Sequence, residues 1–216
     1  MPGDIKSFFI PGPQGPLEAL LNSGAPNATH AALVCHPHPL HGGTVHNKVV
    51  YHTMKALSAH GFPVLRFNFR GAGLSQGAHD DGRGEVDDAR AALDWLASEF
   101  HLPIIAAGFS FGAAVILRAS CGDPRVQGYI SLGTPLAVEQ RAYSYGFLKD
   151  CAMPKLFISG SQDVFSPTPH LENVVASAAP PNKLVVIAGA GHFFVGKLEQ
   201  LRHEIDTWLR AMVLPS

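Results

Sequence analysis

The stretch PIIAAGFSFGAAVILRAS, residues 103–120, decides the fold of this chain. Its first six residues form an apolar run typical of a buried strand, and the residues after Gly112 have the composition of a helix. Between them, GFSFG places Ser110 on a tight turn, with Gly108 and Gly112 at positions where larger side chains would collide with neighbouring backbone. A G-x-S-x-G spacing between a strand and a helix predicts a nucleophilic serine at the edge of a sheet.

Further apolar runs alternate with segments of helical spacing along the rest of the chain. These runs are AALVC (31–35), PVLRFNF (63–69), VQGYISL (126–132), KLFISG (155–160) and KLVVIAG (183–189). Such alternation predicts a parallel sheet with crossover helices. Near the start, DIKSFFI (4–10) and PLEALLN (16–22) flank a turn and predict an antiparallel strand pair.

Amphipathic helices are predicted where apolar residues recur at intervals of three and four. The pattern is found in residues 47–60, 85–100 and 198–212. The segment 136–153 is the only place for a cap, and it is short. We therefore expect one α/β domain over residues 1–216, with a mostly parallel sheet of about eight strands, about six helices on its two faces and no large cap domain.

The composition excludes several classes of protein. Only 15% of the 216 residues are charged, and 16 Lys plus Arg nearly balance 17 Asp plus Glu, which does not favour nucleic acid as a partner. The longest apolar stretch, residues 104–117, is too short and too interrupted to span a membrane. The first residues do not resemble a signal peptide, so we expect a cytoplasmic protein. A homodimer through the sheet edges or the last helix stays open.

The three cysteines are Cys35, Cys121 and Cys151. They are odd in number, widely spaced and set among apolar residues. This pattern favours reduced thiols in the core over a disulfide framework.

A serine nucleophile needs a base, and His192 is the strongest candidate. It follows the late strand 183–189, and loops after the strands of a parallel sheet meet at one edge. Asp163 lies on the loop after the preceding strand, where its carboxylate can orient the imidazole and stabilise its positive form. The chain order Ser110, Asp163, His192 is the order expected for a nucleophile-elbow fold.

GFSFG, the Asp163 loop, His192, RGAGLSQG (70–77) and HPHPLHGG (36–43) occur in an order that resembles the α/β-hydrolase superfamily over nearly the whole chain. The chain looks most like the small bacterial hydrolases grouped near dienelactone hydrolase, although that enzyme has a cysteine at the position of Ser110. The resemblance implies an acyl-enzyme mechanism with Ser110 as nucleophile, His192 as base and Asp163 as its partner.

Two backbone N–H groups are expected to form an oxyanion hole. The N–H of Phe111 lies at the positive end of the helix that follows Ser110. The second donor would come from HPHPLHGG, where Pro37 and Pro39 have no N–H. The N–H of His38 is our first choice for this donor and that of Leu40 is the second.

The same loop permits a metal hypothesis. His36, His38 and His41, followed by His46, resemble the start of the zinc-binding run of metallo-β-lactamase-type hydrolases. However, Leu40 stands where that family has an aspartate, and two prolines restrict how the rings converge. We therefore predict no metal and no cofactor, with a metal-dependent hydrolase as the less favoured alternative.

The substrate is expected to be a small carboxylic ester held by apolar side chains. Those chosen as substrate-binding are Phe109, Tyr143, Tyr145, Phe165 and Phe193. Thioesterase, lactonase and peptidase activities use the same machinery and stay open, as does a non-catalytic binding protein on this fold. Arg70 and Arg141 are candidates to meet an acidic substrate, and the alternative for each is an ordinary ion pair.

Overall fold

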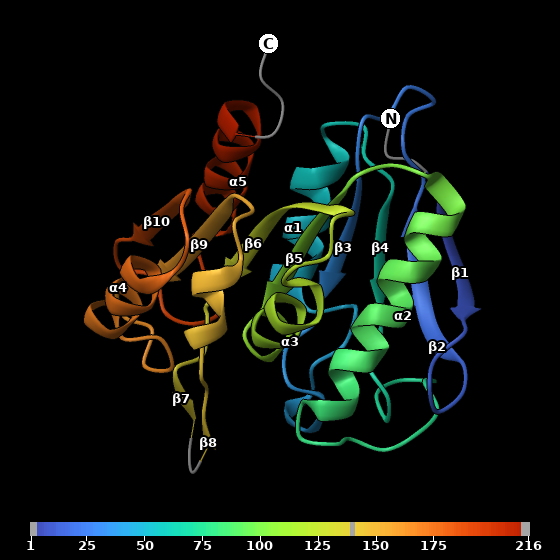
Figure 1. Ribbon diagram of the computed structural model, residues 1–216, viewed down its shortest axis with the longest axis horizontal. Helices are drawn as coiled ribbons and strands as arrows, with labels where there is room; N and C mark the ends of the chain where they lie inside the picture. Colours follow the sequence, from blue (N-terminus) through green and yellow to red (C-terminus); the bar gives the residue numbers. More distant parts are fainter. Residues whose placement is uncertain (1–3, 139–140, 213–216) are drawn as a thin grey trace.

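An eight-stranded sheet runs through the centre of the structure, a computed structural model that describes residues 4–138 and 141–212 (Figure 1). Its strand order is β1-β2-β4-β3-β5-β6-β9-β10. Their bounds are β1 Ile5–Ile10, β2 Leu17–Asn22, β3 Ala31–Cys35, β4 Val64–Phe67, β5 Ile104–Phe109, β6 Val126–Leu132, β9 Lys155–Gly160 and β10 Asn182–Ile187. Strand β2 is antiparallel to both of its neighbours, and the other pairs are parallel. The mostly parallel sheet and the antiparallel pair at the start are confirmed.

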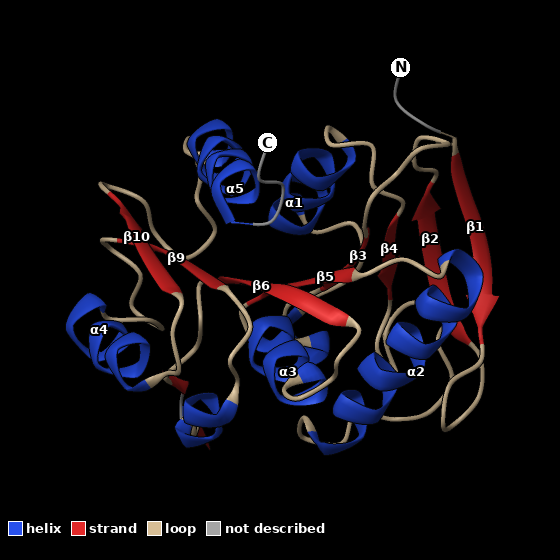
Figure 2. Cartoon of the chain, turned by 45° about the horizontal axis from the view of Figure 1, so that its top comes forward, coloured by secondary structure: helices blue, strands red, loops and turns tan. Residues whose placement is uncertain are grey.

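Five α-helices cover the two faces of the sheet (Figure 2). They are α1 Lys48–Ser58, α2 Arg83–Phe100, α3 Phe111–Ser120, α4 Thr168–Ser177 and α5 Leu198–Met212. Helices α1 and α5 lie side by side on one face, and α2, α3 and α4 lie on the other. The described residues contain five α-helices where the sequence predicted about six, together with two short 3₁₀ turns, η1 (Pro39–His41) and η2 (Gly146–Asp150).

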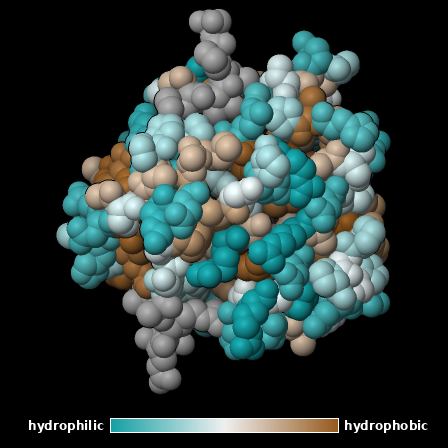
Figure 3. All heavy atoms as spheres, viewed as in Figure 1, coloured by the Kyte–Doolittle hydropathy of each residue, from teal (hydrophilic) through white to brown (hydrophobic). Residues whose placement is uncertain are grey.

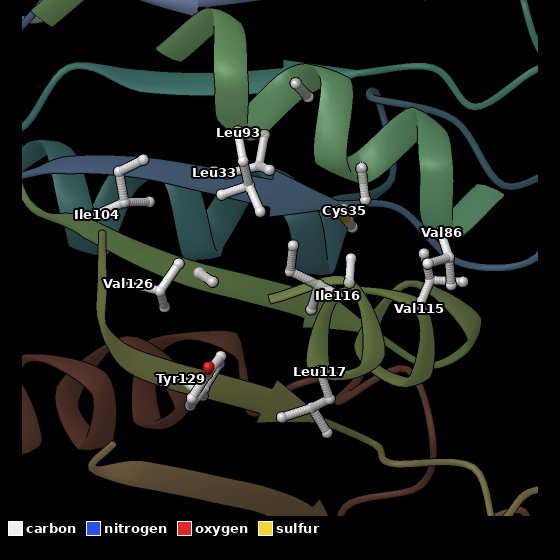
Figure 4. Close-up of a cluster of buried hydrophobic side chains, with 14 of the residues drawn as sticks. Leu33, Cys35, Val86, Leu93, Ile104, Val115, Ile116, Leu117, Val126 and Tyr129 are labelled. Carbon is white, nitrogen blue, oxygen red and sulfur yellow. The ribbon is translucent and has the colours of Figure 1, made fainter. Parts of the chain in front are cut away.

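The central strands β3, β4, β5 and β9 are buried on both faces, which explains their continuous apolar runs, whereas the edge strands β1 and β10 are partly exposed. Along β3, Leu33 and Cys35 point to the α2 and α3 side, whereas Ala32 and Val34 point to the α1 and α5 side. Figure 4 shows Leu33 meeting Leu93 of α2 and the neighbouring side chains of α3, β5 and β6. Each fully buried Leu, Ile or Phe side chain contributes about 1.5–3 kcal/mol relative to exposure.

Helix α2 is polar where it faces solvent, and its exposed residues include Asp87, Arg90 and Asp94. In Figure 3, the outer surface over α2 is mostly hydrophilic, and the hydrophobic areas on this face are small and separate. Among the helices within residues 4–138 and 141–212, none combines the length and apolar character needed to cross a membrane.

The segment expected to be the only place for a cap contains two very short strands, β7 (Ala137–Val138) and β8 (Arg141–Ala142), followed by η2. Its described residues form no additional layer over the sheet. The expectation of a fold without a large cap domain is therefore confirmed.

Two cysteines contradict the prediction of reduced core thiols. Cys121, which ends α3, and Cys151, which ends η2, form a disulfide, while Cys35 is a buried free thiol whose burial raises its pKa. The prediction failed because the two cysteines lie 30 residues apart in the chain and meet only when η2 packs beside the end of α3. The disulfide ties the segment after β6 to the helix that begins at the nucleophile candidate.

Candidate active site

Ser110 occupies a strained turn between β5 and α3. Its φ of 54° and ψ of −122° lie in a region that L-residues rarely adopt. The turn is tight because a Cβ at Gly108 would lie 2.4 Å from the Gly112 carbonyl oxygen, and a Cβ at Gly112 would lie 2.4 Å from the His36 carbonyl oxygen. The glycines thus perform the steric role that the sequence predicted for them.

The structure brings Ser110, His192 and Asp163 together. His192 Nε2 lies 2.9 Å from Ser110 Oγ, and His192 Nδ1 lies 2.8 Å from Asp163 Oδ2. A carboxylate only accepts hydrogen bonds, so this contact places the proton on Nδ1 and leaves Nε2 to accept from the Ser110 hydroxyl. This is the geometry in which a histidine can take the serine proton.

The Asp163 carboxylate is fixed on its other side. Oδ1 accepts the backbone N–H of Phe165 at 2.9 Å and that of Ser166 at 3.2 Å. The Ser159 hydroxyl donates weakly to Oδ2 at 3.4 Å. With Oδ1 occupied by the loop, Oδ2 is the oxygen directed at His192.

Aromatic rings enclose the His192 imidazole. Its centroid lies 4.9 Å from that of Phe109 and 4.7 Å from that of Phe165. A Cβ at Gly133, whose φ is 51°, would lie 3.1 Å from His192 Cε1. The ring is therefore confined on several sides, and Phe109, which is fully buried, lies behind it in the core.

The His36 side chain serves the loop that follows β3. His36 is fully buried, its Nε2 accepts the N–H of Phe69 at 3.0 Å, and its Nδ1 lies 2.6 Å from the Pro37 carbonyl oxygen. Because Nε2 accepts, Nδ1 carries the proton and donates to Pro37. Both ring nitrogens are thus engaged by protein groups, so the metal hypothesis loses the first of its three histidines.

Acidification should destabilise the fold through His36. Burial lowers the pKa of His36 to about 4, whereas an exposed histidine in the unfolded chain titrates near 6.5. The unfolded state therefore binds more protons between these values, and up to about 3 kcal/mol of the free energy of unfolding is lost as pH falls through this window. Denaturant unfolding measured from pH 7 to pH 4 should show that the free energy of unfolding falls less with pH in His36→Gln than in the wild type. Parallel curves would contradict this role.

The predicted oxyanion donors differ in where the structure places them. Phe111 begins α3, where the first N–H groups of a helix have no intrahelical acceptor, and His38 lies on the facing loop. The rings of Phe111 and His38 are in contact, with centroids 4.8 Å apart. Leu40 N–H instead donates to His38 Nδ1 at 3.3 Å, and the Leu40 side chain is 70% exposed. The choice between His38 and Leu40 stays a prediction, with His38 as the first choice.

A cavity of about 270 Å³ opens at Ser110 and His192. The side chains around it are mostly apolar or neutral. Its described lining residues are Pro37, His38, His41, Gly42, Gly43, Asn47, Ser110, Phe111, Tyr143, Phe165, His192 and Phe193. Within this described lining there is no carboxylate, lysine or arginine. The volume is just below the range of about 300–1,000 Å³ that is typical of small-molecule sites.

Three of the residues predicted to bind substrate, namely Tyr143, Phe165 and Phe193, line the cavity. Phe109 and Tyr145 are not brought to it. Phe109 is in the core, and Tyr145 is buried with its hydroxyl donating to the Pro135 carbonyl at 2.7 Å.

Sequence reasoning missed Asn47 and the His41 side chain as part of the cavity wall. Asn47 caps α1 by accepting from the Val49 N–H at 2.9 Å, so the sequence indicated where the helix starts. It did not indicate that the start of this helix points at the cavity.

Arg70 and Arg141 were the candidates to bind an acidic substrate. Arg70 is buried and forms an ion pair with Asp88 of α2, with Nη2 2.7 Å from Oδ1, so it stabilises the fold instead of facing the cavity. The side chain of Arg141 lies outside the part of the chain whose side chains the structure describes.

The sheet order, the serine on the turn between β5 and α3 and the absence of a cap layer among the described residues define an α/β hydrolase. More specifically, the sequence model of the hydrolase family described as serine aminopeptidase, S33, matches residues 38–154, and the chain belongs to this family.

The chain is also similar to three individual proteins. An uncharacterised protein of Rickettsia prowazekii is 35% identical over 95% of this chain and 89% of its own length. A structure described as an alpha-beta serine hydrolase homologue from Coxiella burnetii is 38% identical, with a TM-score of 0.87, and the match covers 95% of this chain and 97% of that one. A Xanthomonas campestris protein described as a serine hydrolase without lid is 32% identical, with a TM-score of 0.87 over 100% of this chain and 98% of its own. The resemblance to the α/β-hydrolase superfamily is confirmed, and the likeness to dienelactone hydrolase stays a prediction.

Proposed function

We propose that this hydrolase cleaves small carboxylic esters through an acyl-enzyme formed on Ser110. The observation that carries the proposal is the hydrogen-bonded series Ser110 Oγ, His192 Nε2, His192 Nδ1 and Asp163 Oδ2, with separations of 2.9 and 2.8 Å, at an apolar cavity. Serine, histidine and aspartate in this relation recur in unrelated acyl-transfer enzymes.

In the first half of the reaction, Ser110 Oγ attacks the ester carbonyl carbon while His192 Nε2 takes the hydroxyl proton. The carbonyl oxygen becomes an oxyanion, which we assign to the backbone N–H groups of Phe111 and His38. The tetrahedral intermediate then collapses. The bond to the alkoxide breaks, His192 gives its proton to the departing oxygen, and the acyl group stays on Ser110.

In the second half, a water molecule takes the place of the alcohol. His192 accepts a proton from the water, whose oxygen attacks the acyl carbon, and the second tetrahedral intermediate expels Ser110 Oγ. The proton returns to Ser110 and the carboxylic acid is released. Asp163 stays ionised throughout and stabilises the imidazolium that forms twice in the cycle.

An ester substrate is favoured over an aminoacyl amide by the described cavity wall. An aminopeptidase must bind a free ammonium group, for which carboxylates are the usual partners. None of the described lining residues is acidic, and Phe111, Phe165 and Phe193 offer apolar surface instead. The acyl group that fits such a wall is short and uncharged.

A panel of matched substrates tests the proposal. We expect 4-nitrophenyl acetate and butyrate to be hydrolysed with a kcat/KM at least about tenfold higher than the octanoate ester, because one small cavity must hold the acyl chain. Leucine 4-nitroanilide should be a still poorer substrate. Ser110→Ala provides the background rate for every compound. Faster turnover of the aminoacyl anilide than of the esters would contradict the proposal.

A further inference from the structure

Three aromatic rings from distant parts of the sequence stack beside the cavity. The His38 ring centroid lies 4.8 Å from that of Phe111 and 4.7 Å from that of His79, and the His79 and Phe111 centroids are 5.6 Å apart. Each ring therefore contacts the other two. His79 lies on the loop before α2, and residues of such connecting loops usually face solvent.

His79 is instead nearly buried, with a side chain only 9% exposed, and a buried carboxylate lies beside it. Its Nδ1 lies 2.7 Å from Oε1 of Glu85, which is fully buried in the first turn of α2. The Glu85 carboxylate also accepts the backbone N–H groups of Asp80 at 2.9 Å and Gly82 at 2.7 Å. These two backbone contacts hold the Glu85 carboxylate in place beside His79, although the close approach of Nδ1 is not aligned as a hydrogen bond.

The other two rings of the stack belong to the two residues whose backbone N–H groups we assign to the oxyanion. His38 is carried by the loop after β3, and its carbonyl accepts the N–H groups of His41 at 3.1 Å and Gly43 at 3.0 Å. Phe111 is fixed at the start of α3. The packing of His38 on Phe111 and His79 therefore sets how far the loop stands from the helix.

We propose that His79, anchored by Glu85, is a positioning residue that sets the oxyanion hole by holding the His38 ring against Phe111. The inference rests on the proposed function. His79 touches neither Ser110 nor His192 in the described contacts, so it acts through His38. The effect should be large, because one oxyanion donor is worth about 10²- to 10³-fold in rate and a displacement of about 1 Å costs about 10²-fold.

Two substitutions of His79 test the role. His79→Ala removes both the ring contacts and the Glu85 contact, and kcat for 4-nitrophenyl butyrate should fall about 10- to 100-fold with KM changed less than about twofold. His79→Phe keeps a ring against His38 but loses the contact with Glu85, and kcat should fall by a smaller factor of about five to ten. If His79→Ala fails to fold, His79→Phe carries the test.

The second measurement uses an aryl trifluoromethyl ketone, which forms a tetrahedral adduct with a serine and places an oxyanion in the hole. Its affinity should fall in parallel with kcat/KM in both variants, while inhibition by butyrate stays at the wild-type level. His60→Phe is the matched control, because His60 also lies beside a carboxylate, with Nε2 2.9 Å from Asp206 Oδ1 of α5, but it is on the turn after α1 and does not line the cavity. It should leave kcat and the ketone affinity unchanged.

The outcomes separate the two proposals. A folded His79→Phe protein with wild-type kcat and ketone affinity would overturn the positioning role, as would an equal loss in His60→Phe. Failure of the wild type to form the ketone adduct at Ser110 would instead overturn the proposed function.

Discussion

Replacing Ser110 with alanine is expected to lower kcat for 4-nitrophenyl butyrate by about 10⁵- to 10⁶-fold. The substitution removes only the oxygen that lies 2.9 Å from His192 Nε2 and keeps the Cβ on the strained turn. The fold should therefore survive, which circular dichroism and thermal unfolding will check. The residual rate measures what the oxyanion hole and the cavity achieve without a nucleophile.

The double variant sharpens this prediction. Ser110 and His192 act as one unit in the proposed mechanism, so His192→Ala should cost about as much as Ser110→Ala, and the double variant should cost little more than either. If the loss of kcat in the double variant equalled the product of the two single losses, the two side chains would not act in the same step. A folded Ser110→Ala protein that keeps more than about a tenth of the activity would show that another residue attacks the ester.

The second large effect is expected for Asp163→Asn, with a loss in kcat of about 10⁴-fold. The asparagine oxygen should occupy the position of Oδ1, because the N–H groups of Phe165 and Ser166 donate there. Its amide nitrogen would then face His192 and donate to Nδ1. That contact moves the imidazole proton to Nε2, where it blocks transfer from Ser110.

The comparison variant for this prediction is Asp206→Asn. Asp206 also lies beside a histidine, His60, but it is on α5, which contributes no residue to the described cavity lining, so kcat should stay within about twofold. A steady-state pH profile of both variants with the aryl ester supplies the measurement. Similar losses in Asp163→Asn and Asp206→Asn would contradict the assignment of Asp163.

The sequence was sufficient for the architecture and for the residues the structure brings together at Ser110. Parallel strands buried on both faces produce continuous apolar runs, and those runs locate the loop after each strand. Loops after parallel strands converge, so Asp163 and His192 followed from their positions alone. The glycines of GFSFG could also be recognised from the sequence, because a side chain at Gly108 or Gly112 would collide with neighbouring backbone.

Features that depend on the direction in which individual side chains point could not be predicted from the sequence. Phe109 alternates to the core side of β5, and Tyr145 turns its hydroxyl to Pro135, so neither aromatic reaches the cavity. The disulfide joins the ends of α3 and η2, and the ring contacts of His38, His79 and Phe111 join three separate segments, so both depend on how those segments pack. Leu40 falls inside a 3₁₀ turn, which directs its N–H to His38 Nδ1.

The most direct test of the account is covalent labelling by a fluorophosphonate, which reacts with serines activated by a neighbouring base. Intact-mass and peptide analysis of the wild type should show one adduct, on Ser110, because His192 Nε2 can take its proton. His192→Ala should label far more slowly, and Ser110→Ala should not label. An adduct on another residue, or equal labelling of Ser110→Ala, would contradict the assignment of this chain as a hydrolase that uses Ser110 as its nucleophile.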